Sequence, residues 1–109
     1  MDRDRTFLLD MLAAAQLAIS YMGDKSEEEF LADVQCQDSV IRRLEIMGEA
    51  ARRVSSAARA THTDLPWKEM IGMRNILAHD YDDVDLAIVF RTVRFELPRI
   101  VTILEKLLS

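Results

Sequence analysis

Apolar residues recur at alternating steps of three and four along three stretches of this chain, which is the spacing of one face of an α-helix. The two clearest series are Val40, Leu44, Met47, Ala51, Val54 and Ala58, and Leu86, Phe90, Val93, Leu97, Ile100, Leu104 and Leu107. A helix with such a stripe buries it against a neighbour. With three Gly and two Pro in 109 residues, the pattern predicts an all-α protein, a four- to five-helix up-and-down bundle.

Capping residues and helix breakers predict where these helices begin and end. Ser26 followed by Glu29 indicates a capping box, and Gly23 is suited to end the preceding helix. We expect Pro98 to kink the last helix without ending it, and the small Gly48 to let a neighbouring helix approach closely. The expected helices span residues 4–22, 26 to about 33, 37 to about 60, about 64–79 and 86–108.

Length and composition narrow the class of protein. One helical domain spanning residues 1–109 is expected. The single Cys36 cannot form an internal disulfide, which favours a reducing cytoplasm. The longest uncharged run, Met11 to Met22, is shorter than the ~20 residues of a membrane span, so no membrane partner is expected. A net charge of −5 argues against a general nucleic-acid coat protein.

Basic residues nevertheless gather in one region and predict a local basic face. A solvated helix face is the plainer interpretation. Glu45 and Glu49 either neutralise arginines along their own helix, which we favour, or face a cleft, for which Glu49 is the better candidate. The basic residues between positions 41 and 60 are Arg42, Arg43, Arg52, Arg53 and Arg59.

The segment "RNILAHDY" places Arg74, His79 and Tyr81 near the end of the fourth helix. Five residues separate Arg74 from His79, so on a regular helix they lie ~140° apart. They can act together if the helix unwinds before His79, or if two copies meet across a twofold axis. We favour a homodimer, which would place two Arg–His pairs in one cleft.

Such a cleft suits cleavage of RNA without a metal. An imidazole titrates near neutral pH and can take a proton from a 2′-hydroxyl or return one to a leaving oxygen, while a guanidinium holds the phosphate. The plainer interpretation is that His79 favours the helix dipole and that Arg74 pairs with Glu69 or Asp80. No metal or cofactor is expected, since "DYDDVD" lacks the Gly and terminal Glu of a calcium loop.

Several segments together resemble the HepT-like branch of the HEPN superfamily, whose motif is R-x4-H-x-Y. The resemblance runs from about Phe7 to Leu108. It rests on "EEEFLAD", "SVIRRLEIMGEAARRVS", "LPWKEMIGMRNILAHDY" and "LPRIV".

This resemblance implies a dimerising helical bundle and a metal-independent ribonuclease toxin. It implies that Arg74 and His79 are catalytic and that Asn75 assists. It also implies a partner, a minimal nucleotidyltransferase antitoxin of the MNT type, which transfers AMP to Tyr81 and so silences the toxin. The RNA-binding face is then expected to include Arg42, Arg43, Arg52 and Arg53.

Two other hypotheses stay open at the level of sequence. The chain can be a non-catalytic binding partner or regulatory subunit of a nucleotidyltransferase, for which an acidic surface is at least as suitable. It can also be a structural dimer whose motif only stabilises a helix end.

Overall fold

The fold is built from helices that alternate in direction. The computed structural model describes residues 3–79 and 84–109, and no strand occurs among them. This confirms the prediction of an all-α fold. The helices are α1 (Arg3–Met22), α2 (Glu27–Leu31), α3 (Val34–Arg53), α4 (Ser56–Thr61), α5 (Trp67–His79), α6 (Leu86–Arg91) and α7 (Leu97–Leu108), with a π-helical turn η2 (Thr92–Glu96) between the last two.

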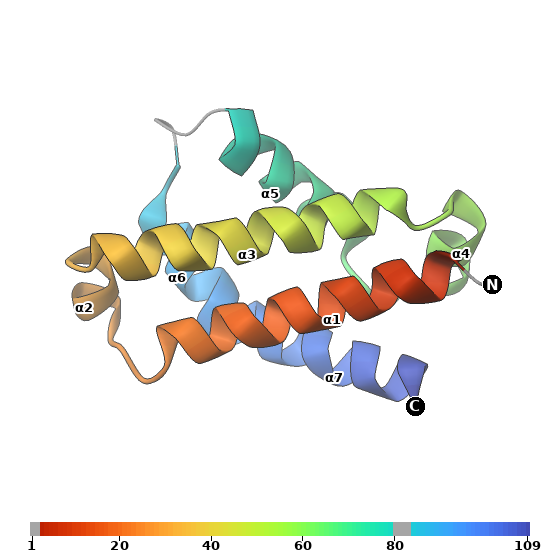
Figure 1. Cartoon of the computed structure of the whole chain (residues 1–109), viewed down its shortest axis with the longest axis horizontal. Helices are drawn as coiled ribbons and strands as arrows, with labels where there is room; N and C mark the ends of the chain where they lie inside the picture. The colour runs from red at the N-terminus through yellow and green to blue at the C-terminus, as the bar shows by residue number, and fades with distance from the viewer. Residues whose placement is uncertain (1–2, 80–83) are drawn as a thin grey trace.

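Four long segments run up and down side by side (Figure 1). Helix α3 packs on α1, α5 packs chiefly on α3, and α7 packs on the other side of α1. Residues of α5, η2 and α7 meet around one pocket beside Met47 of α3, so the segments form a bundle. The short helices α2 and α4 lie at opposite ends of α3.

Side-chain caps explain where several of these helices start and stop. Ser26 and Glu29 form the predicted capping box at the start of α2. Gly23 follows α1 with φ of 53°, a left-handed conformation that glycine adopts without strain. Both predictions are confirmed.

The bounds predicted for the third helix are wrong at both ends. Helix α3 begins earlier because the carboxylate of Asp33 accepts the backbone N–H of Cys36 and caps the helix there. It stops at Arg53 because Val54 is extended and Ser55 caps a separate helix, α4. Asp4 of α1 accepts hydrogen bonds from both the backbone N–H and the hydroxyl of Ser55, at 2.8 and 2.7 Å.

The irregularity expected at Pro98 lies just before the proline. Residues Thr92–Glu96 form a π-helical turn, and the N–H of Leu97 bonds to the carbonyl of Thr92 instead of a carbonyl four residues back. Proline cannot donate to the preceding turn, and a π-turn is a common way for a helix to absorb such a defect. The chain changes direction between α6 and α7 without ending the helical run (Figure 1).

The two predicted apolar stripes supply much of the core. All members of the α3 stripe up to Val54 are buried, as are the central members of the last stripe. The largest fully buried side chains are Phe30, Met11, Met22, Leu44, Leu97, Leu104, Val40, Val54 and Val93. No helix in the described residues is long and apolar enough to cross a membrane.

Gly48 is the point of closest approach between α3 and α5. A Cβ atom at Gly48 would collide with the Cβ of Arg74 and lie 2.8 Å from the carbonyl oxygen of Met70. Both are parts of the α5 framework that cannot swing away. Gly72 of α5 is different, because a Cβ there would meet nothing within 4 Å. The two helical glycines thus form a matched pair for mutation.

We predict that Gly48→Ala lowers the free energy of unfolding by about 1–3 kcal/mol, since the added methyl forces α5 away from α3. Gly72→Ala is expected to be neutral or to stabilise by up to about 1 kcal/mol, because alanine favours the helix and meets open space. Urea unfolding followed by circular dichroism measures both. Equal destabilisation by the two substitutions would contradict the role given to Gly48.

Candidate active site

Arg74 lies against α3 with its guanidinium held at both ends. Its Nη2 atom is 3.1 Å from Oε2 of Glu49, and its Nη1 donates to Oδ1 of Asn75 at 3.0 Å. The position follows from the glycine contact, because the stem of Arg74 passes over Gly48 and Glu49 is the next residue of α3. A guanidinium has five N–H donors, so further donors of Arg74 are available to a ligand.

Glu49 collects three arginines around one carboxylate. Besides Arg74, it accepts from Arg52 at 2.8 Å and from Arg53 at 3.1 Å. The hydrogen bond from Arg52, helped by Arg53 and the charge of Arg74 and opposed by partial burial, lowers the pKa of Glu49 to about 2. Both interpretations of Glu49 therefore hold: it neutralises arginines of its own helix and also pairs with Arg74.

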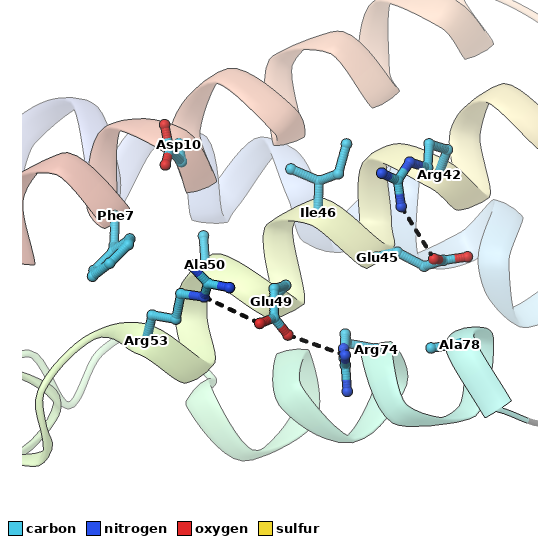
Figure 2. Close-up of a pocket in the computed structure, with 10 residues that line it drawn as sticks. All are labelled: Phe7, Asp10, Arg42, Glu45, Ile46, Glu49, Ala50, Arg53, Arg74 and Ala78. Atoms are coloured by element: carbon cyan, nitrogen blue, oxygen red, sulfur yellow. Dashed lines mark hydrogen bonds and ion pairs between the residues drawn. The ribbon is translucent and has the colours of Figure 1, made fainter.

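Glu49, Arg53 and Arg74 line a pocket of about 310 Å³ between α1, α3 and α5. Figure 2 shows Arg53 and Arg74 reaching Glu49 from opposite sides, with Phe7 and Asp10 of α1 across from them. Sequence reasoning missed the α1 residues, since nothing in periodicity tells which exposed positions of α1 flank a cleft. The charged residues of the lining are three arginines and three carboxylates, which are Arg42, Arg53, Arg74, Asp10, Glu45 and Glu49.

The arginines of α3 do not form one free basic face. Arg42 pairs with Glu45 at 3.5 Å. Arg43 lies over the ring of Tyr21 in α1, 5.9 Å from its centroid. Together with the ion pairs of Glu49, these contacts give each of the four arginines a partner within the protein. Whether they contact RNA stays a prediction.

His79 is the last residue of α5 and is exposed. The α-helix is unbroken up to this residue, which excludes the alternative in which the helix unwinds before His79. Within one chain, His79 and Arg74 therefore lie on different sides of α5, and it is Ala78 that lines the Arg74 pocket. Among the described residues the ionic partner of Arg74 is Glu49, not Glu69, and Asp80, the other expected partner, lies outside the described residues.

Asn75 connects the two sides. Its side-chain oxygen accepts from Arg74, and its position, four residues before His79, places it on the same helical face as the histidine. The amide N–H groups of Asn75 have no partner within the described residues and can donate to a ligand oxygen. The assisting role of Asn75 stays a prediction.

Two other expectations concern metal binding and modification. Within residues 3–79 and 84–109, no group of three or more His, Cys, Asp or Glu side chains is arranged to hold a metal ion. Tyr81, the expected site of AMP transfer, lies outside the described residues.

We predict that Glu49→Gln destabilises the protein near neutral pH by up to about 1 kcal/mol. Glutamate titrates near 4.3 in an unfolded chain and at about 2 here. The stabilisation is therefore complete above about pH 5 and is lost as the pH falls toward 2. Urea unfolding of both proteins between pH 7 and 2.5 should show the difference shrinking with acidification. Glu105→Gln on α7, whose carboxylate makes no ion pair in the described residues, is the control.

Comparison with known proteins identifies the family. The family model "Ribonuclease HepT-like" matches residues 11–107. The chain is 38% identical over 96 residues to "Putative RNase MJ1380" of Methanocaldococcus jannaschii, covering 88% of each protein. It is 35% identical over 103 residues to "Probable ribonuclease HepT" of Thermococcus cleftensis, covering 94% of each. No solved structure matches. The chain belongs to the HepT-like ribonuclease family.

Proposed function

We propose that this protein is a cytoplasmic, metal-independent endoribonuclease that uses Arg74 and His79. The observation that carries the proposal is the placement of Arg74, whose guanidinium is oriented by Glu49 and Asn75 at the wall of a pocket. A preoriented guanidinium with donors to spare suits a phosphate whose charge increases during the reaction. The names of the relatives support the same class of activity.

The reaction that we assign to Arg74 and His79 is an intramolecular transesterification within the RNA strand. An imidazole of His79 takes the proton of a 2′-hydroxyl, whose oxygen forms a bond to the adjacent phosphorus. The bond from phosphorus to the 5′-oxygen breaks, and this oxygen takes a proton. The products are a 2′,3′-cyclic phosphate and a free 5′-hydroxyl. Arg74 holds the phosphate oxygens, and the amide of Asn75 donates to the same group.

A homodimer resolves the separation of Arg74 from His79. Ile76 precedes His79 by three residues and lies on the same face of α5. Ile76 and Ile88 of α6 line one mainly apolar groove, and their side chains are 49% and 51% exposed. Burying this surface against a second copy would bring the two copies of His79 into one cleft. One imidazole would then serve as the base and the other as the acid.

We further propose that the protein is the toxin of a toxin–antitoxin pair, with a nucleotidyltransferase of the MNT type as antitoxin. This part rests on the family resemblance of the "RNILAHDY" segment. AMP on Tyr81 would add a phosphate two residues after His79. Its negative charge would repel RNA phosphates and its base would occupy space at the cleft.

A non-catalytic role as the binding partner of a nucleotidyltransferase is the second candidate. The charge balance of the Arg74 pocket favours it, since three carboxylates face three arginines there. In that case Arg74 and Asn75 would position a nucleotide, and His79 would take no part in RNA chemistry.

We predict that His79→Ala lowers RNA cleavage by purified protein about 10²- to 10⁴-fold, the usual contribution of an acid–base side chain. His62→Ala is the matched control, because His62 is the other of the two histidines in the chain and uses its backbone carbonyl, not its ring, to bind Trp67. Cleavage of single-stranded RNA is followed on denaturing gels. Equal activity of wild type and His79→Ala would reject the ribonuclease mechanism and favour the second candidate.

A cleft shared by the two protomers of a dimer leads to a second prediction. Wild type and His79→Ala are co-expressed in equal amounts and purified together. If both imidazoles of a dimer are needed, only wild-type homodimers cleave RNA, and the activity per total protein is about a quarter of wild type for random pairing. An activity of about half would mean that each protomer works alone and would contradict the composite cleft.

A further inference from the structure

A second groove, separate from the Arg74 pocket, lies between α4 and α5. It has a volume of about 690 Å³, and its lining includes Arg59 of α4 and Trp67, Lys68, Gly72 and Asn75 of α5. No carboxylate is part of this lining. The groove is therefore basic on a protein whose net charge is −5.

The two cations of the groove have no ionic partners within the described residues. Neither Arg59 nor Lys68 forms an ion pair there, in contrast to Arg74, which is paired with Glu49. The positive charge of this groove is therefore available to an anionic ligand, whereas the arginines of α3 are already neutralised or stacked.

Trp67 adds an aromatic wall in a fixed position. Its indole Nε1 donates to the carbonyl oxygen of His62 at 2.8 Å, which holds the half-buried ring at the groove. Cations that follow a backbone beside an aromatic ring are the usual means of binding single-stranded nucleic acid. The same combination is less suited to a protein partner, for which an apolar centre is expected.

The groove leads toward His79. Lys68, Gly72, Asn75 and His79 are spaced four, three and four along α5, so they lie on one helical face. Gly72 leaves the middle of this face open, since a Cβ there would have no neighbour within 4 Å. A strand lying in the groove would thus pass Asn75, which is bonded to Arg74, and reach the exposed imidazole.

We propose that the α4–α5 groove binds the RNA strand beside the phosphate that is cleaved. Arg59 and Lys68 bind backbone phosphates, and Trp67 contacts a base. This site rests on the proposed ribonuclease function and supplies its substrate-binding surface. It replaces the α3 arginines as the main RNA contact.

Trp67 is the one tryptophan of the chain, so its fluorescence reports on this groove. The wild-type protein is titrated with a 2′-O-methyl RNA of about 12 nucleotides, which keeps the phosphates but lacks the attacking hydroxyl. Fluorescence of Trp67 and anisotropy of a label on the RNA are recorded together over a series of salt concentrations. The test variant is Arg59→Gln combined with Lys68→Gln.

We expect RNA to quench Trp67 and the double variant to bind at least about tenfold more weakly. The slope of log K against log salt should fall by about 1.4, because two phosphate contacts to a single strand are lost. The control is Arg99→Gln with Lys106→Gln, which removes the same charge from α7, a helix that contributes no residue to the lining of the groove. The control should leave both the affinity and the slope unchanged.

Three results would overturn the proposal that the α4–α5 groove binds RNA. They are equal effects of the two double variants, binding by anisotropy without a change in Trp67 fluorescence, and no binding of RNA at all. A change of Trp67 fluorescence only with the nucleotidyltransferase would assign the groove to that protein instead. Cleavage by wild type but not by His79→Ala separates the two proposals, since the ribonuclease function then stands even if the groove fails.

Discussion

The architecture of the site depends on how closely α5 approaches α3 at Gly48. Helix α5 packs chiefly on α3, and at the crossing the carbonyl of Met70 and the stem of Arg74 occupy the space that a side chain at position 48 would need. The same contact places Arg74 beside Glu49, which follows Gly48 in α3. The packing of α5 and the orientation of the Arg74 guanidinium therefore depend on the same contact, and a change in the packing alters the orientation.

Charge is distributed over α5 in two different ways. On one side, Arg74 belongs to a cluster in which the carboxylate of Glu49 is ionised at every physiological pH, because its pKa is lowered to about 2. On the other side, Lys68 has no carboxylate partner among the described residues. A phosphate must compete with Glu49 for Arg74, whereas it meets no competing carboxylate at Lys68. An acidic protein can in this way present a local surface suited to a polyanion.

The sequence predicts the elements of this fold better than their junctions. Apolar periodicity identifies the buried faces of α3 and the last helical run, and local capping explains α2, because both depend on residues a few positions apart. The break after Arg53 was not predictable in this way, since it depends on Ser55 and on Asp4, which lies 51 residues away in the sequence. The pairing of Glu49 with Arg74 is equally non-local, since the two residues belong to different helices.

The bond between Asp4 and Ser55 ties the first turn of α1 to the cap of α4. Since α4 carries Arg59, the geometry of the basic groove depends on the N-terminal turn of the chain as well as on its own walls. Figure 1 shows this turn beside α4 at one end of the bundle. A change in the first turn of α1 is therefore expected to alter the basic groove, although this turn contributes no residue to the lining.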